Sequence, residues 1–320
     1  MDRRRFLAAA ASALLLSAGA AHAAYPERPV SCVVPFPPGG RTDLTARLIT
    51  QHLQKHLGQP VVVVNKPGAG GVLGAKEVAA AAPDGYTLGV FSTAVVTAQY
   101  TVPTPTDLKD YAAIAVVNID PMALAVKIDA PWKTPAELVA YGRANPGKLR
   151  IGMIPGASAQ IFAAAFAKAA NLQATYVPFK GDADGAAALA GGHIDVHVAV
   201  PVSYKALADA NRVRILGVAA ESRSPLYRDV PTFREHGVNL VIGSFHVVFA
   251  PRRTPPDVLR TLEAALEKTM REPELVQQMA GSSLGIAFLN QADTAAYLAQ
   301  QDAAYRRIID EVGMRVAPQK

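Results

Sequence analysis

The sequence predicts an α/β protein with two lobes and a cleft between them. From Pro29 onward, short β-branched runs alternate with longer helical patterns, which is typical of strands and helices around a mainly parallel sheet. This series stops at the proline-dotted residues 101–109, and a second series of the same kind follows. At 320 residues the chain exceeds the usual size of one compact domain, so two series indicate two domains.

The first series has the order strand, helix, strand, helix, strand. A helix is expected after Gly40, because Leu44, Leu48, Ile49, Leu53 and Leu57 fall near one helical face and Gly58 supplies a stop. The other expected elements are strands at 30–35, 61–64 and 88–91 and a helix at 72–82.

The second series follows two apolar runs, at 112–117 and 122–126, that suit a crossing between domains. Its expected elements are helices at 135–144, 158–170 and 183–190 and strands at 150–153, 174–177, 194–200 and 214–218. Another apolar run covers 243–250.

The tail is helical. Leu259, Leu262, Leu266 and Met270 share one face, and a second stripe comprises Leu298, Tyr305, Ile309 and Val312. These helices need a sheet that is already built, so we expect the chain to return to the first domain. Lobe 1 is then residues 24–124 and 244–320, and lobe 2 is residues 125–243.

Residues 1–23 form an expected signal peptide. A basic start with Arg3, Arg4 and Arg5 precedes the apolar residues 6–21, and Ala21-His22-Ala23 fits a cleavage site. We therefore expect export to a bacterial periplasm, by either the Sec or the Tat route. The alternative is that residues 1–23 stay attached as an uncleaved membrane anchor. Cleavage lowers the net charge from +6 to about +4.

Composition excludes several classes of protein. With 50% hydrophobic and 18% charged residues the chain is folded, not disordered. Its one cysteine, Cys32, allows neither an intrachain disulfide nor a cysteine-based metal cluster, and its buried-strand context favours an inert core thiol. The basic residues are scattered without interleaved aromatics, so nucleic acid is not an expected partner and a small anionic ligand fits better.

Three glycine-containing turns precede expected helices, at 38–43, 70–71 and 155–158. Glycine lets backbone amides approach a ligand closely, and the free amides of a helix N-terminus attract a carboxylate. The alternative is that a tight connection simply requires glycine. The first and third turns follow strands whose carboxyl ends should face the cleft, although Thr42 or Asp43 is also a candidate N-cap.

Other candidate sites have weaker support. The glycine spacing of residues 68–74 does not fit a dinucleotide loop. His52 and His56 lie four residues apart on a helix but lack a nearby carboxylate, which favours a solvated face over a metal site.

His193, Asp195 and His197 alternate along an expected strand and so share one face, and metal binding there is the alternative to an ordinary strand face. No nucleophile–base pair and no metal set emerges, so we expect neither an enzyme nor a cofactor.

Ordered motifs along the whole mature chain resemble the Bug family, the periplasmic substrate-binding proteins of tripartite tricarboxylate transporters. The motifs are Tyr25-Pro26-Glu27-Arg28-Pro29-Val30, Val33-Val34-Pro35-Phe36-Pro37-Pro38-Gly39-Gly40, Leu57-Gly58-Gln59-Pro60-Val61, Asn65-Lys66-Pro67-Gly68-Ala69-Gly70-Gly71, Ala82-Pro83-Asp84-Gly85-Tyr86, Asn145-Pro146-Gly147-Lys148-Leu149, Val177-Pro178-Phe179-Lys180-Gly181 and Gly191-Gly192-His193-Ile194-Asp195.

This resemblance implies a fold like that of type II periplasmic binding proteins, which closes on its ligand and presents it to a two-component membrane permease. It also implies ligand-binding positions in the loops that face the cleft. Carried onto this chain, they are Phe36, Pro38, Gly39, Gly40, Thr42, Asp43, Ser92, Thr93, Gly156, Ala157, Ser158, Ala159, Lys180, Gly181, Asp182 and Phe245.

The chain departs from the family pattern at three places. Val198-Ala199-Val200 replaces a common Phe-Asp-Asn, which removes polar groups from the cleft wall and weakens the expectation of a polar amino acid or hydroxy acid. Phe245-His246-Val247 stands where Trp-Phe-Gly is usual. Arg41 follows the paired glycines, and it either binds a second ligand carboxylate or projects into solvent.

The resulting prediction is a monomeric receptor for a small organic carboxylate that serves a tripartite tricarboxylate permease. An aromatic acid or another less polar solute is the alternative ligand, and a sensor that docks on a membrane kinase is the alternative role.

Overall fold

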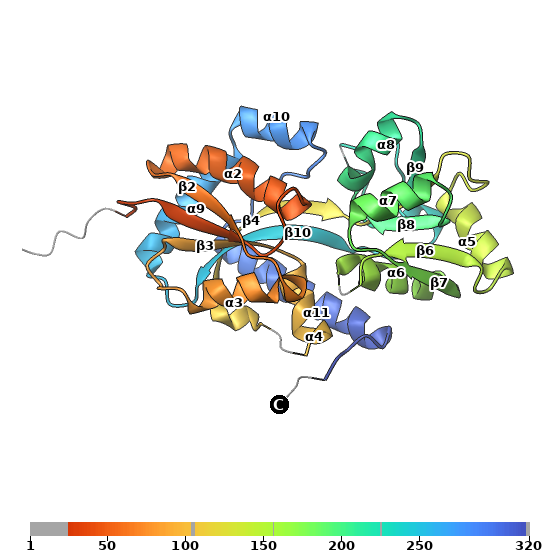
Figure 1. Ribbon diagram of the computed structural model, residues 1–320, viewed down its shortest axis with the longest axis horizontal. Coiled ribbons are helices and arrows are strands. Elements are labelled where there is room, and N and C mark those ends of the chain that lie inside the picture. The colour runs from red at the N-terminus through yellow and green to blue at the C-terminus, as the bar shows by residue number, and fades with distance from the viewer. Residues whose placement is uncertain (1–24, 104–105, 156, 225, 318–320) are drawn as a thin grey trace, which may run out of the picture.

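The computed structural model describes residues 25–103, 106–155, 157–224 and 226–317 and shows two lobes side by side along its long axis (Figure 1). Lobe 1 is built on a five-stranded sheet in the order β2-β1-β3-β10-β4, and lobe 2 on one in the order β7-β6-β8-β5-β9. The α/β prediction with two mixed sheets is therefore confirmed. The expected signal peptide lies outside the described residues.

The two sheets share one plan. Three strands run parallel, a fourth is antiparallel to them, and a fifth completes the sheet beyond it. In lobe 1 the strands are β1 (Val30–Val34), β2 (Val61–Asn65), β3 (Thr87–Ser92), β10 (Gly243–Pro251) and β4 (Tyr111–Pro121). In lobe 2 they are β6 (Leu149–Met153), β7 (Ala174–Pro178), β8 (Val196–Ala199), β5 (Ala123–Lys127) and β9 (Val213–Val218).

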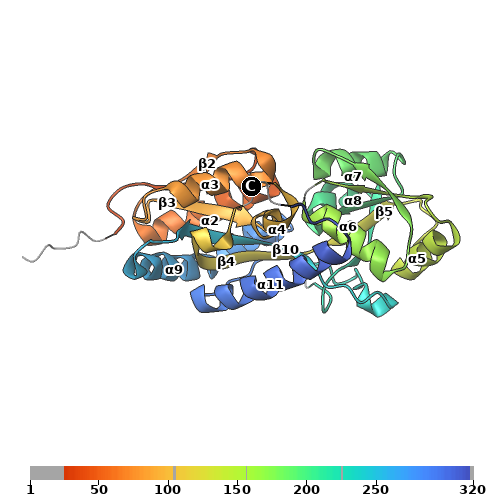
Figure 2. The same cartoon turned by 90° about the horizontal axis from the view of Figure 1, so that it is seen from below.

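Helices cover both faces of each sheet (Figures 1 and 2). In lobe 1, α2 (Arg41–Leu57), α9 (Pro256–Met270) and α10 (Pro273–Gly281) cover one face, and α3 (Val72–Ala80), α4 (Ala94–Thr101) and α11 (Gln291–Glu311) cover the other. In lobe 2, α7 (Asp182–Ala190) and α8 (Lys205–Asp209) lie opposite α5 (Pro135–Ala144) and α6 (Ser158–Ala169).

Strand β1 shows why a sheet covered on both faces reads as a continuous apolar run. Val30, Cys32 and Val34 belong to the core under α2, whereas Val33 points into the opposite core. Cys32 is buried, as expected, and burial raises the pKa of its thiol to about 12 against the opposing effect of a hydrogen bond with the Val90 backbone.

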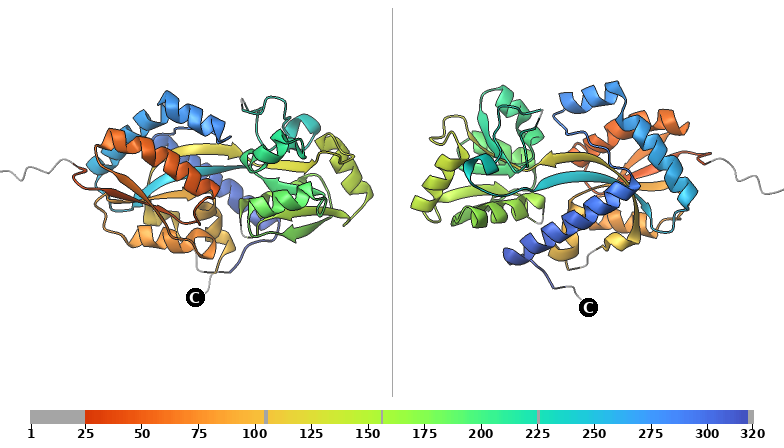
Figure 3. Two further views of the ribbon diagram at one scale, coloured as in Figure 1. Left: turned by 45° about the horizontal axis from the view of Figure 1, so that its top comes forward. Right: turned by 180° about the vertical axis from the view of Figure 1, so that it is seen from behind.

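Two segments connect the lobes. Met122 joins β4 to β5, and its N–H donates to the carbonyl of Ile242, which leads into β10, at 3.1 Å. Helix α11 adds a third contact, because it runs from lobe 1 to α6 (Figures 2 and 3), where Lys168 Nζ donates to the carbonyl oxygen of Glu311 at 3.1 Å. None of the helices in the described residues is both long and apolar enough to span a bilayer.

The buried face of α2 differs from the expected one. Leu44 is 37% exposed, whereas the polar side chains of Asp43, Thr45, Thr50 and His52 are buried. The leucine stripe was therefore only partly right, because Asp43 and His52 have polar partners on other elements on the buried side of this helix. Helix α4 was not expected; its buried residues, 95–98, are consecutive and give no helical period.

Candidate functional site

A cavity of about 140 Å³ lies between the lobes, at the carboxyl ends of β1, β3, β6 and β8. Loops at this edge of open α/β sheets are where such folds bind ligands. Lobe 1 contributes Phe36, Arg41, Thr42, Ser92, Ala94 and Ser244, and the crossing contributes Met122. Lobe 2 contributes Ile154, Ala157, Ser158, Ala159, Asp182, Ala199 and Val200.

Two helix N-termini reach this cavity from opposite lobes. Helix α2 begins at Arg41 and α6 at Ser158, and neither N-cap residue, Gly40 or Ala157, makes a side-chain capping bond. The first amides of a helix have no intrahelical acceptor and carry partial positive charge, so both termini favour an anion. The suggestion that Thr42 or Asp43 is the N-cap is wrong.

Asp43 holds the turn before α2. Its Oδ2 accepts from Gly39 N and from Arg47 Nε, both at 2.9 Å, and its Oδ1 accepts from Asn65 Nδ2 at 2.8 Å. Burial alone would raise the pKa of Asp43, but these hydrogen bonds outweigh it and hold the pKa below its usual value. Gly39 has φ of 81°.

Pro38, Gly39 and Gly40, all predicted ligand-binding residues, are exposed beside the cavity and do not line it. They shape the turn that presents α2.

Arg41 reaches into the cavity with its guanidinium held from behind. Nη1 donates to Asp120 Oδ2 at 2.5 Å and to Asn118 Oδ1 at 3.2 Å, and Nη2 donates to Ser244 Oγ at 2.5 Å. The side chain is only 14% exposed, so the idea that it projects into solvent is wrong. A guanidinium has five N–H donors, which leaves donors free for a ligand.

His246 belongs to the same network. Asn118 donates through Nδ2 to Asp120 at 3.0 Å, so its Oδ1 faces His246 Nδ1 at 2.8 Å as an acceptor. This assigns the imidazole proton to Nδ1, and Nε2 accepts from the Thr42 hydroxyl at 3.0 Å. Burial and the nearby Arg41 charge hold the pKa of His246 well below its usual range, so the ring is neutral.

Thr93 and Phe245 lie behind the cavity wall. The Phe245 N–H donates to Thr93 Oγ1 at 2.9 Å, and the Thr93 N–H donates to the Phe245 carbonyl at 3.1 Å. Both residues are 1% exposed, and the Phe245 ring packs edge-on against Tyr297. They position Ser92 and Ser244, which do line the cavity.

The predicted residues around the start of α7 do not all face the cavity. Asp182, the first residue of α7, lines the cavity, whereas Lys180 is exposed and Gly181 is the N-cap. Ser203 Oγ donates to Asp182 Oδ2 at 2.9 Å, and burial raises the pKa of Asp182. Gly156, also predicted as a ligand-binding residue, lies outside the described residues.

Sequence reasoning missed Ser244, Met122, Ile154 and Ala94 as lining residues. Ser244 directly follows the point where the chain re-enters lobe 1, and that position was the available signal. Of the run Val198-Ala199-Val200, Ala199 and Val200 form an apolar part of the wall, whereas Val198 is in the core.

Of His52 and His56, only His56 lies on a solvated face. His52 is fully buried, and its Nδ1 lies 2.5 Å from Glu272 Oε2, while His56 Nε2 lies 2.6 Å from Glu272 Oε1. Lys55 Nζ approaches the same carboxylate at 3.3 Å, so an ammonium already sits in this cluster. The missing carboxylate was 216 residues away in sequence and could not be read from the helix.

His193, Asp195 and His197 do not share a face. Asp195 lies before β8 and forms a half-buried pair with Arg150, with Oδ1 2.7 Å from Nη2, and of the three residues only His197 is in the strand. His197 is buried, and burial lowers its pKa to about 4. Neither ring nitrogen has a hydrogen-bond partner among the described residues.

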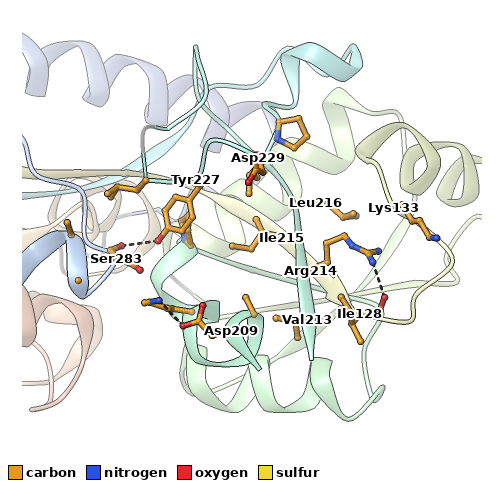
Figure 4. A pocket seen from close by; sticks show the side chains of 18 residues that line it. Ile128, Lys133, Asp209, Val213, Arg214, Ile215, Leu216, Tyr227, Asp229 and Ser283 are labelled. Atoms are coloured by element: carbon orange, nitrogen blue, oxygen red, sulfur yellow. Dashed lines mark hydrogen bonds and ion pairs between the residues drawn. The ribbon is translucent and has the colours of Figure 1, made fainter. Parts of the chain in front are cut away.

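A larger groove of about 740 Å³ lies beside β9 (Figure 4). Some of its charged groups have partners: Lys205 Nζ lies 2.7 Å from Asp209, and Arg214 Nη2 donates to the Ile128 carbonyl at 3.2 Å, whereas Arg214 Nη1 is buried without a partner among the described residues. Tyr227 closes one end by donating to the Ser283 carbonyl at 3.2 Å. Within the described residues, the only α-helix that begins at a lining residue of this groove is the five-residue α8, at Lys205. The longer helices α2 and α6 both begin at the interlobe cavity, so the smaller cavity is the better candidate site.

A family model described as "Tripartite tricarboxylate transporter family receptor" matches residues 45–314. The chain belongs to this receptor family. The family consists of solute-binding receptors, so the prediction that the chain is not an enzyme is confirmed, as is the resemblance to Bug proteins.

Full-length relatives support this assignment. A UPF0065 protein of Cupriavidus necator is 34% identical over 99% of this chain and 100% of its own length. The periplasmic binding protein BugD is 28% identical, with a TM-score of 0.80 over 91% of this chain and 99% of its own. MatC of Rhodopseudomonas palustris, solved with malate, is 29% identical, with a TM-score of 0.77 over 89% of this chain and 100% of its own.

Proposed function

We propose that this protein is a periplasmic receptor that captures a small organic carboxylate in the interlobe cavity and delivers it to a two-component tripartite tricarboxylate permease. The observation that carries the proposal is the convergence of the α2 and α6 N-termini, from opposite lobes, on a cavity that also contains Arg41. Export by residues 1–23, the predicted lobe limits and a monomeric state belong to the same proposal.

The cavity offers three kinds of contact. Amides of the first turns of α2 and α6 receive the carboxylate, with the remaining N–H groups of Arg41 as its cationic partner. The hydroxyls of Ser92 and Ser158 supply further hydrogen bonds, whereas the Thr42 hydroxyl already donates to His246. Phe36, Ala199 and other apolar residues cover the carbon skeleton. Because contacts come from both lobes, ligand binding favours lobe closure.

Thermal unfolding of the ligand-stripped mature protein tests the receptor function. A panel of carboxylates is compared with their uncharged amides. A ligand present at 100 times its dissociation constant adds about 2.7 kcal/mol to the free energy of unfolding. A saturable rise with a carboxylate that is absent with its amide supports the proposal, whereas equal rises with both would contradict an anion site.

An aromatic acid is the second candidate ligand, favoured by the apolar wall of Ala199, Val200 and Phe36. Benzoate-type compounds in the same panel decide between an aliphatic and an aromatic ligand.

Delivery to the permease is tested by uptake of the identified solute in cells that lack the receptor. Uptake should fall on deletion and return with the wild-type chain, and unchanged uptake would contradict a transport role.

A further inference from the structure

Only two ionisable side chains line the described part of the interlobe cavity, and they come from opposite lobes. Arg41 is on α2 of lobe 1, and Asp182 begins α7 of lobe 2. Lys180, the nearest basic residue in sequence to Asp182, is exposed and does not line the cavity. The charges that a ligand meets are therefore set by Arg41, Asp182 and the groups directly behind them.

The Arg41 charge is already compensated from behind. Asp120 lies 2.5 Å from Nη1, its side chain is only 4% exposed, and its Oδ1 accepts from Gly285 N at 2.7 Å. His246, the other titratable group of this network, is neutral because its pKa is lowered by burial and by Arg41. Arg41 thus faces the carboxyl groups of both Asp120 and Asp182, and a ligand with two negative charges would have no second cation among the described lining residues to meet.

One carboxylate oxygen of Asp182, Oδ1, can accept a hydrogen bond from a ligand. Ser203 Oγ donates to its Oδ2 at 2.9 Å, and within the described residues no donor bonds Oδ1. The titratable groups that face this carboxyl are Arg41 across the cavity and Tyr204, a buried phenol whose pKa is raised well above its usual value. Tyr204 donates to the carbonyl of His197 at 2.8 Å, so its hydroxyl proton is already used.

We propose that Asp182 makes this receptor selective for monocarboxylates that carry a hydroxyl or ammonium donor, and that it disfavours dicarboxylates. The inference rests on the proposed function and names the ligand class of the same cavity. The ligand carboxylate binds the helix amides and Arg41, while its donor group binds Oδ1 of Asp182. A second carboxylate placed there would meet the Asp182 carboxyl, whose pKa burial already raises, so it could enter only against a like charge or with the uptake of a proton.

Asp182 therefore sets specificity by repulsion as well as attraction. The alternative is that Arg41 itself binds a second ligand carboxylate. The first account predicts a preference for monocarboxylates with a donor group, and the second predicts a preference for dicarboxylates. Ligands that share one skeleton can therefore separate them.

The test uses 4-aminobutyrate, 4-hydroxybutyrate, butyrate and succinate, which differ only at the fourth carbon, together with the shorter series 3-aminopropionate, 3-hydroxypropionate, propionate and malonate, which differ only at the third carbon. Calorimetry on the wild type and on Asp182→Asn gives the affinities. Asparagine keeps the acceptor for Ser203 and the shape of the side chain but removes the charge. Asp184→Asn, an exposed change on the same helix, is the matched control.

We expect the wild type to bind a donor-bearing monocarboxylate at least tenfold more tightly than the dicarboxylate of its series. Asp182→Asn should narrow this ratio by about tenfold or reverse it, whereas Asp184→Asn should leave it unchanged. Asp182→Ser provides the same reading if the first variant does not fold.

Two results overturn the inference. A wild type that prefers the dicarboxylate refutes it, and so does a preference that Asp182→Asn and Asp182→Ser leave unaltered, while carboxylate binding in either case preserves the proposed function. If the folded wild type binds no carboxylate of any class, the proposed function fails and the inference fails with it.

Discussion

At the scale of single residues, two departures from the family pattern belong to one network. Arg41 and His246 are 205 positions apart, yet both bond Asn118 Oδ1, at 3.2 Å and 2.8 Å. Asn118 also donates to Asp120 and to the carbonyl of Gly285. An arginine in the cleft therefore requires the acceptors Asp120, Asn118 and Ser244 to hold it, and these acceptors lie on β4 and β10.

Arg41→Ala should lower the free energy of unfolding by about 3 kcal/mol. The change leaves Asp120 buried without its cation, and breaking a buried ion pair costs more than the pair itself contributes. Urea denaturation measures the loss. Arg28→Ala removes an exposed guanidinium that pairs with Asp84, and it should cost under about 1 kcal/mol.

The double variant Arg41→Ala/Asp120→Asn completes the cycle. It should recover part of the lost stability, because the stranded charge is gone. If the stability lost in Arg41→Ala and the stability lost in Asp120→Asn simply add in the double variant, the result would argue against the ion pair between Arg41 and Asp120.

At the scale of elements, α7 packs on β8 through a glycine. A Cβ at Gly185 would lie 2.1 Å from His197 Nε2, and His197 is held between the rings of Phe179 and Tyr204. Alanine at a helical glycine usually stabilises by about 1 kcal/mol, but here it has no room.

Gly185→Ala should therefore lower the melting temperature. Gly281→Ala, at the end of α10 where a Cβ meets nothing within 4 Å, should leave it unchanged or raise it. Thermal unfolding compares the two variants. A Gly185→Ala variant as stable as Gly281→Ala would contradict the packing of α7 on β8.

A second element-scale contact joins α2 to the turn between α9 and α10. The hydrogen bond from His52, with those from His56 and Lys55, lowers the pKa of Glu272 to about 2. A carboxyl whose pKa is lowered by folding stabilises the fold fully at pH values above the pKa it has in the unfolded chain, about 4.3. This stabilisation is lost as the pH falls toward 2.

Glu272→Gln should lower the melting temperature at pH 6 and flatten its fall between about pH 4 and pH 2. Glu274→Gln, a change at a carboxylate that is 62% exposed and lies 3.5 Å from Lys55, is the control and should keep the wild-type slope. Parallel pH profiles for wild type and Glu272→Gln would show that this carboxylate does not join the helices.

The order of elements was predictable because local pattern decides it, but the partners of polar residues were not. Most strands fell within about two residues of their expected limits, and Gly58 ends α2 as expected, with φ of 69°. The buried side of α2 was misjudged because His52 is satisfied by Glu272 and Gln278, which lie on a distant segment of the chain. Helix spacing alone contains no information about such contacts.

The same limit applies to the site. The glycine-containing turns located the helix N-termini from sequence, because a strand, a tight turn and a helix form a local pattern. Whether a residue of these loops faces the cavity depends on packing. Asp182 faces it, whereas Lys180 and Thr93, each one or two residues from a lining residue, do not.

At the scale of the whole molecule, the lobes share one hydrophobic cluster. Phe91 and Phe249 of lobe 1 and Phe162 and Phe233 of lobe 2 belong to it, with Met122 of the crossing between them. The contact of α11 with α6 adds to this connection. The lobes are therefore joined by a continuous core on the side where the chain crosses.

The mature protein should unfold in one cooperative calorimetric transition. A shared core makes the stability of each lobe depend on the other, so the calorimetric and van't Hoff enthalpies should agree. Two separated transitions would contradict the shared core. A calorimetric enthalpy well above the van't Hoff enthalpy would contradict it too.

The central claim is that the α2 and α6 N-termini and Arg41 hold a carboxylate between the lobes. The most direct measurement is a crystal structure of the ligand-stripped protein with the carboxylate that gives the largest thermal shift. We predict ligand density in the interlobe cavity, with the carboxylate on the first-turn amides of α2 and α6 and on Arg41. Density in the groove beside β9, or a carboxylate turned away from both helices, would contradict the claim.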